Sequence, residues 1–255
     1  MLPARLKRSS LYQAIAASLF PLSGHQYPSP WYTPYKFREL SRVLRRPSNP
    51  AHLPPGYGRW LDERIIEYPW FFSRLPSGSG KLLDAGSALN FKLLLEHPKV
   101  REKTLTIMTL APEEECFWRH NISYLYGDLR QTSLRADYFD WIACISTLEH
   151  IGLDNTLFYT HDLSRKENDP DSYLAALREL HRVLRPGGSL FITVPFGRRD
   201  VRAWLQVFDR EMLAVVVAAF QPVSCSQLFF HYSPARGWQS CLPGDIEAAR
   251  YFDPR

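Results

Sequence analysis

Cysteine is scarce in this 255-residue sequence, which contains only four. They stand far apart, and no two form a Cys-x-x-Cys pair: Cys116, Cys144, Cys225 and Cys241. Disulfide-rich small domains and structural zinc sites need closely spaced cysteines, so this spacing argues against both classes. We expect free thiols, no metal site and a reducing compartment, and we assign the protein to the cytoplasm.

Long hydrophobic runs are also missing. The apolar run at residues 11–22 is interrupted by Tyr12, Gln13 and Pro21. It is shorter than the roughly 20 apolar residues that cross a bilayer, and no cleavage site of small residues follows it. We therefore expect neither a transmembrane segment nor a signal peptide. A helix lying on a membrane surface stays open.

Acidic residues are nearly absent from the first 59 positions. Glu39 is the only acid there against nine basic side chains, so this segment carries a formal charge of +8. It also holds nine of the 20 prolines and several aromatic residues. This composition predicts an N-terminal extension over residues 1–58, followed by one domain over residues 59–255. Such an extension either wraps the domain or binds the phosphates of nucleic acid or lipid, and we favour the wrap.

Glycine is sparse where a phosphate-binding turn would need it. Residues 81–90 are Lys-Leu-Leu-Asp-Ala-Gly-Ser-Ala-Leu-Asn, an apolar run followed by a turn with Gly86 alone. A dinucleotide fingerprint needs three glycines, and a P-loop needs a Lys-Ser/Thr pair, so neither motif is present. Asp84 instead precedes the turn, at the strand end where such sheets bind ligands, and its charge suits a cation. Taken alone, the pattern is equally typical of an ordinary strand-to-helix turn.

Strand and helix patterns alternate along the chain. Strand-like runs occupy residues 81–85, 104–110, 122–126, 139–146 and 189–195. Apolar residues at helical spacing predict a helix over 173–184, and further helix candidates cover 60–75, 89–95 and 204–220. This alternation predicts an α/β, Rossmann-like doubly wound fold with a mostly parallel sheet, preceded by the basic, Pro/aromatic-rich extension.

Four motifs, in this order, resemble the core of the class I S-adenosyl-L-methionine (SAM)-dependent methyltransferases, of the type 11-like kind. They are Leu83-Asp84-Ala85-Gly86-Ser87, Gly127-Asp128-Leu129, Phe139-Asp140 with Glu149-His150-Ile151, and Leu-His-Arg-Val-Leu-Arg-Pro-Gly-Gly at 180–188. Their joint order is more specific than any one motif, and the resemblance covers residues 81–196. It implies a methyltransferase with SAM as cofactor. The family closes its sheet with a C-terminal hairpin; here we expect a strand within 223–232 and no clear strand in 237–255.

The resemblance also implies cofactor-binding roles for matching residues. Asp84, Gly86 and Ser87 would face the methionyl part of SAM, with Asp84 near its ammonium group or an ordered water. Asp128 would accept a hydrogen bond from the adenine amine, and Leu129 would support the ring.

Two departures from the family concern the ribose and the turn. Thr109 stands where the family usually has an acid that holds both ribose hydroxyls, and a threonine offers one hydroxyl contact in its place. Glu113 or another of the acids that follow is an alternative partner for the ribose. Ala88 and Asn90 occupy turn positions that are usually glycine. Ser146 begins the loop that would line the methyl-transfer pocket.

Methyl transfer needs few special residues, because an in-line displacement gains much from proximity and alignment. An oxygen acceptor is helped by a base of near-neutral pKa, so His150 is the first catalytic candidate, with Glu149 as its neighbour or orienter. The alternative for this pair is a loop position without a chemical role. We predict methyl transfer to oxygen of a small-molecule or sugar-like acceptor. Two alternatives stay open: a binding or regulatory protein without turnover, and an RNA methyltransferase that uses the basic arm.

Overall fold

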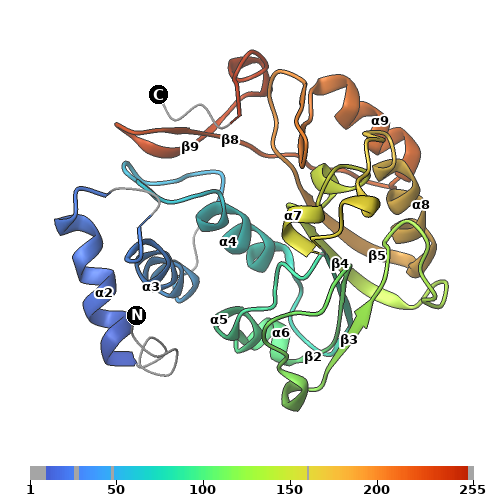
Figure 1. The fold of residues 1–255 in the computed structure, drawn as a ribbon, viewed down its shortest axis with the longest axis horizontal. Helices are drawn as coiled ribbons and strands as arrows, with labels where there is room; N and C mark the ends of the chain where they lie inside the picture. The colour runs from blue at the N-terminus through green and yellow to red at the C-terminus, as the bar shows by residue number, and fades with distance from the viewer. Residues whose placement is uncertain (1–9, 26–28, 47–48, 160, 252–255) are drawn as a thin grey trace. The chain divides into compact units, whose positions relative to one another are not determined.

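The computed structural model describes residues 10–25, 29–46, 49–159 and 161–251 (Figure 1). The chain divides into two compact units, and each is described by itself. The first comprises residues 1–74 and 230–240, and the second comprises residues 75–229 and 241–255. The domain boundary expected after residue 58 therefore lies within the first unit.

The second unit is built on a five-stranded sheet in the order β3-β2-β1-β4-β5. All of its strands run parallel: β1 Gly80–Ala85, β2 Lys103–Thr109, β3 Ile122–Tyr126, β4 Phe139–Ile145 and β5 Leu184–Thr193. The chain runs from β1 outward through β2 to β3, then crosses to β4 and continues to β5 on the other side. This topology confirms the Rossmann-like doubly wound fold that the alternating pattern predicts.

The core of this unit lies between the sheet and the helix α8 (Tyr173–Val183). Ala176, Leu180 and Val183 of α8 are fully buried and belong to one apolar cluster with Phe139 and Ile142 of β4. Figure 1 shows α8 beside β5, with α9 (Arg210–Phe220) next to α8. The helix predicted over residues 173–184 is therefore confirmed, because its apolar spacing matches the face that it buries.

The helix expected over residues 89–95 is much shorter. Only α5 (Lys92–Leu95) is helical there, and α6 (Pro98–Arg101) follows as a separate turn. Phe91 is extended with φ of −125°, and Pro98 holds the preceding His97 extended with ψ of 132°. Local backbone constraints at both ends thus override the apolar spacing.

Other boundaries shift for equally local reasons. The strand expected at 189–195 begins at Leu184, because β4 and β5 already pair at Phe139 and Leu184, and a register shift absorbs residues 185–188. The helix expected over 204–220 begins at Arg210, where the Asp209 side chain accepts a hydrogen bond from Met212 N–H at 2.9 Å. The short pair β6 (Asp200–Val201) and β7 (Gln206–Val207) precedes it.

The C-terminal strands do not extend the central sheet. The strand expected within 223–232 is β8 (Phe229–Ser233), and it forms a two-stranded sheet with β9 (Gly237–Cys241). The expectation of no strand in 237–255 is therefore wrong. Within the first unit, Trp238 N–H donates to Tyr57 O at 2.8 Å, a partner far away in sequence that the apolar pattern does not reveal. Among the described strands, β5 remains an edge of the central sheet.

The first unit contains three helices within the described residues: α2 (Ser10–Leu22), α3 (Tyr32–Leu44) and α4 (Arg64–Arg74). Phe20 and Leu40 are fully buried between them, and the ring of Phe20 meets Tyr32 edge-on. The 60–75 helix expected from sequence is α4, which starts four residues later than predicted. Among the described residues, no helix is both long and apolar enough to cross a bilayer.

A partly exposed ion pair within α8, between Glu179 and Arg182, holds the segment after β3 against this helix. Arg182 Nε donates to Glu179 Oε1 at 2.8 Å, and Thr132 N–H donates to Glu179 Oε2 at 3.0 Å. These bonds, Arg182 above all, lower the pKa of Glu179 from 4.5 to about 2 although burial opposes the shift. Because the folded pKa lies below the unfolded value, Glu179 stabilises the fold above pH 4.5 and loses this contribution as the pH falls towards 2.

We expect Glu179→Gln to lower the free energy of unfolding at neutral pH by about 1–2 kcal/mol, because solvent at the partly exposed Arg182 screens the ion pair. The difference from the wild type should shrink as the pH falls from 4.5 towards 2, where half of the Glu179 carboxyl groups of the folded protein are protonated. Urea unfolding between pH 2 and 7 measures it, with exposed Glu114→Gln as the control. A difference that is constant with pH would contradict the assignment.

Candidate functional site

The candidate site lies at the carboxyl ends of the parallel strands. β1 to β4 all end at this edge, so the segments after Ala85, Thr109, Tyr126 and Ile145 gather there. The strand order reverses between β1 and β4, and ligands of doubly wound sheets bind at such a switch point. The sheet therefore brings the predicted cofactor residues to one edge.

Asp84 closes the turn after β1. Its side chain is fully buried, and its Oδ2 accepts a hydrogen bond from Leu89 N–H at 2.8 Å. Burial raises the pKa of the neighbouring Cys144 thiol, and the negative charges of Glu149 and Asp84 raise it further. The carboxylates of Asp84, in β1, and Glu149, in the segment after β4, therefore both lie close to Cys144.

Gly86 is required at the turn for two reasons. Its φ is +110°, a backbone conformation that side chains rarely adopt, and a Cβ there would overlap Thr147 Oγ1 and lie 2.6 Å from Thr147 Cγ2. Ser87 follows with a φ of +60°. The turn after β1 thus lies directly against the loop after β4, and the sequence gives no sign of Thr147 as its partner.

Asn90 replaces a usual turn glycine with a side chain that makes specific contacts. It is buried, its Nδ2 donates to Glu115 O at 2.9 Å, and its Oδ1 accepts from Tyr124 Oη–H at 2.9 Å. This asparagine ties the turn after β1 to the segments beside β2 and β3. Glu113 lies beside β3, because its charge contributes to the raised pKa of Tyr124.

Asp128 follows β3 and pairs with Arg130. Arg130 Nε lies 3.0 Å from Oδ1 and 2.9 Å from Oδ2, and Nη2 lies 2.6 Å from Oδ2. Burial raises the pKa of Asp128, but its hydrogen bonds with Arg130 and the charge of Arg130 outweigh burial and lower it. The other side of the guanidinium holds Glu167 at 2.7 Å. Leu129 is buried in the apolar cluster of the core.

Thr109 is the last residue of β2, and Ser146 directly follows the last residue of β4. Thr109 is buried, and its carbonyl accepts a hydrogen bond from Gly127 N–H at 2.9 Å, which aligns the ends of β2 and β3. Ser146 has a φ of +42°, and its N–H donates to Thr193 Oγ1 at 2.9 Å. These contacts fix the strand ends from which both hydroxyl groups project.

His150 is held by Trp204. Its Nδ1 lies 2.7 Å from Trp204 O, and its ring stacks on the indole with centroids 5.5 Å apart and planes 13° from parallel. A carbonyl oxygen only accepts hydrogen bonds, so Nδ1 carries the proton and the lone pair of neutral His150 lies on Nε2. Buried Glu149 lies on this second side, with its Oε1 3.9 Å from Nε2. The orienting contact at Nδ1 thus comes from a residue that sequence reasoning missed.

The donor set at this edge fits a cationic nucleoside such as SAM. It offers the carboxylates of Asp84 and Asp128 and the hydroxyl of Thr109, and Gly86 keeps the turn free of a side chain. Pyrophosphate would need a glycine-rich run of N–H donors, which residues 86–90 do not supply. Within the described part of the chain, no group of three or more metal-ligating side chains is found.

Comparisons with known proteins give a family match. Residues 85–192 match the family model described as a methyltransferase domain. The solved 1,6-didemethyltoxoflavin-N1-methyltransferase of Burkholderia thailandensis is 17% identical over 93% of this chain and 88% of that chain, with a TM-score of 0.47. A putative sarcosine dimethylglycine methyltransferase of Galdieria sulphuraria is 16% identical over 64% of this chain and 63% of its own, also with a TM-score of 0.47. No curated protein matches the chain.

Proposed function

We propose that this chain, whose residues 85–192 match the model of a methyltransferase domain, is a class I, SAM-dependent methyltransferase that methylates an oxygen atom of a small-molecule or sugar-like acceptor in the cytoplasm. The observation that carries the proposal is the 2.7 Å contact between His150 Nδ1 and Trp204 O, which assigns the proton to Nδ1 and the basic lone pair to Nε2. Oxygen acceptors gain from such a base, because a hydroxyl group must lose its proton as it attacks.

SAM supplies an electrophilic methyl group on its sulfonium. Asp84, Gly86 and Ser87 would hold the methionyl part, and the buried charge of Asp84 suits the ammonium group. Asp128 would accept a hydrogen bond from the adenine amine in place of one of its present bonds from Arg130, which supplies two donors to each carboxylate oxygen. Leu129 would back the ring.

Three further residues complete the proposed site. Thr109 would bind one ribose hydroxyl, and Ser146 would line the pocket beside the reacting methyl group. His150 Nε2 would take the proton of the acceptor hydroxyl, while Nδ1–H stays on Trp204 O. Glu149, 3.9 Å from Nε2, would stabilise the imidazolium that forms.

A protein that binds SAM without turnover is the second candidate. The pairing of Asp128 with Arg130 and the threonine at position 109 favour it, because both weaken cofactor contacts that the family usually makes. Calorimetric titration with SAM and S-adenosylhomocysteine, followed by a search of cell extracts for acceptors of labelled methyl groups, separates the two. SAM binding without any methyl transfer would support the second candidate, and a lack of SAM binding would contradict both.

We expect His150→Asn to lower kcat by about 10²–10⁴-fold while SAM affinity stays within about twofold. The asparagine amide keeps an N–H for Trp204 O but has no basic nitrogen, so the change isolates the base. Labelled-methyl transfer at saturating SAM measures the effect. An unchanged rate would contradict the proposed base role. It would favour a neutral nitrogen as the methylated atom, because such a nitrogen needs no base before it attacks.

A further inference from the structure

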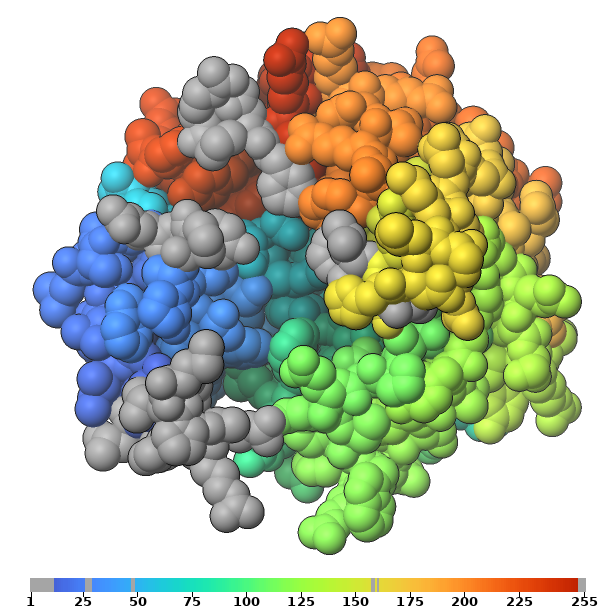
Figure 2. All heavy atoms as spheres, viewed as in Figure 1, coloured from blue at the N-terminus to red at the C-terminus, as the bar shows by residue number. Residues whose placement is uncertain are grey.

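The outer face of α2 is apolar and uncharged. No charged side chain occurs in Ser10–Leu22, and the exposed positions with determined side chains are Ala14, Ile15, Ser18, Pro21 and Leu22. Ile15 is 53% exposed and Leu22 is 81% exposed. The five exposed positions lie on one helix face, because Ser18 is three or four residues away from each of the others. α2 therefore presents an apolar strip to solvent. Figure 2 shows α2 and α3, in blue, at the surface.

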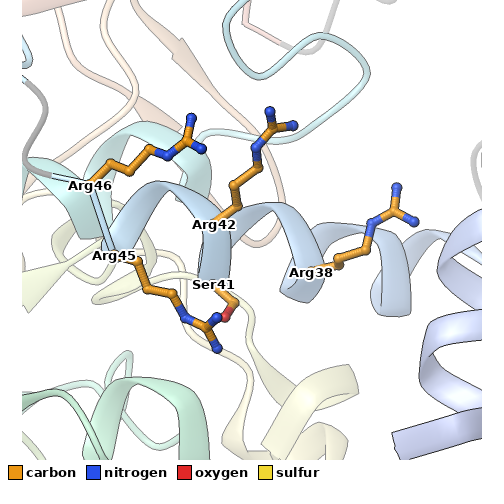
Figure 3. A pocket seen from close by; sticks show the side chains of 5 residues that line it. All are labelled: Arg38, Ser41, Arg42, Arg45 and Arg46. Atoms are coloured by element: carbon orange, nitrogen blue, oxygen red, sulfur yellow. The ribbon is translucent and has the colours of Figure 1, made fainter.

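The neighbouring helix α3 carries a cluster of arginines. Arg38, Arg42, Arg45 and Arg46 line a hollow of about 450 Å³ together with Ser41. Figure 3 shows the side chains of Arg38, Arg42 and Arg46 reaching out on the same side of the helix. Arg38 and Arg42 lie within α3, about 6 Å of helix rise apart, whereas Arg45 is the C-cap residue and Arg46 follows the helix.

The charge of this cluster is largely uncompensated. Glu39 lies 3.3 Å from Arg38 and 3.7 Å from Arg42, and it is the only acid in α3. Within the described part of the chain, no carboxylate forms an ion pair with Arg45 or Arg46. The cluster therefore has charge to offer to an external anion.

The apolar strip and the arginine cluster are adjacent. Arg38 Nη1 donates to Ser18 Oγ at 3.3 Å, and Ser18 is itself part of the exposed strip on α2. One surface thus combines aliphatic side chains with guanidinium groups beside them. This combination is typical of proteins that lie on an anionic bilayer, with apolar groups among the acyl chains and arginines at the phosphates.

We propose that the α2–α3 surface docks on a membrane of anionic phospholipids. The apolar strip decides against nucleic acid, because aliphatic side chains gain little from a phosphate backbone. Binders of single strands also present aromatic platforms. Two of the three aromatic rings of α3 instead pack inward, since Tyr32 is buried and Tyr35 lies against Phe20, and the third, Phe37, is half-buried.

The test is co-sedimentation of the full-length protein with phosphatidylcholine vesicles that contain phosphatidylglycerol. We expect binding to these vesicles and none to pure phosphatidylcholine. Each basic residue at such a surface contributes about fivefold in affinity, so Arg45→Gln with Arg46→Gln should weaken binding by about 30-fold. The matched control, Arg101→Gln with Arg119→Gln, removes two exposed arginines of the second unit and should change binding less than about twofold.

The apolar half of the surface has its own pair of variants. Ile15→Ser with Leu22→Ser should weaken vesicle binding by about tenfold, whereas Leu163→Ser with Leu242→Ser, at exposed leucines of the second unit, should leave it unchanged. Arg45→Lys with Arg46→Lys keeps the charge and should keep the binding. Thermal melting of each variant checks the fold.

Three outcomes would overturn the proposal. The first is equal binding to neutral and anionic vesicles, and the second is full binding by the Ile15/Leu22 variant. The third is a protein that ignores vesicles but binds duplex RNA through Arg45 and Arg46. None of these outcomes depends on SAM binding, so the proposal stands or fails separately from the methyltransferase function.

Discussion

Replacing Asp84 by asparagine is expected to weaken SAM binding about 100-fold. The carboxylate is fully buried at the switch point of the sheet, where the proposed ammonium partner would meet it. Removing one partner of a buried charge pair costs about 2–5 kcal/mol, and 100-fold corresponds to about 2.7 kcal/mol. The amide keeps the shape of the side chain and an oxygen for Leu89 N–H, so the loss reports the charge. Isothermal titration with SAM measures it.

Asp140→Asn is the matched control for this change. Asp140 lies near the amino end of β4, at the opposite end of the strands from Asp84. Its Oδ2 accepts a hydrogen bond from Lys81 N–H at 2.6 Å, and Arg185 lies 2.7 Å from Oδ1. We expect this variant to lose about 1–2 kcal/mol of stability but to bind SAM within about twofold of the wild type. A folded Asp84→Asn protein with wild-type affinity would refute the proposed role of Asp84.

Gly86→Ala is expected to lower the melting temperature by about 10 °C. The positive φ costs about 1–2 kcal/mol, and the overlap of the new Cβ with Thr147 adds about 1–3 kcal/mol. A loss of about 3 kcal/mol shifts the melting temperature of a protein of this size by about 6–12 °C. Thermal melting followed by circular dichroism measures the shift.

Gly187→Ala separates the two causes. Gly187 also has a positive φ, of +76°, but a Cβ there would meet no atom within 4 Å. We therefore expect only the backbone strain, a loss of about 1 kcal/mol and a shift of about 3 °C. Equal shifts for the two variants would mean that contact with Thr147 does not constrain the turn.

The sheet is predictable from sequence because buried parallel strands are nearly continuous apolar runs. The runs at residues 82–85, 105–109 and 142–145 bury every side chain. The helix predicted over residues 89–95 is shorter in the structure, because the extended backbone at Phe91 and His97 limits its length. Strand β9 was missed because its contact with Tyr57 bridges most of the chain.

The candidate site is predictable only where it sits on strand ends. Asp84 follows from the strand pattern and Asp128 from the family resemblance, and parallel strands carry both to one edge. Trp204 stands 54 positions from His150, so no local pattern links the indole and carbonyl to the imidazole that they hold. Contacts made by loops depend on the path of the backbone, and spacing in the sequence does not encode that path.

Arg130 donates hydrogen bonds to two carboxylates, those of Asp128 after β3 and Glu167 in the segment that leads to α8. A single guanidinium therefore links the carboxylate that we propose to meet the adenine to the segment before α8. Any ligand that draws Asp128 away also loosens the hold on Glu167, and by thermodynamic reciprocity a molecule that displaces Glu167 changes the affinity at Asp128.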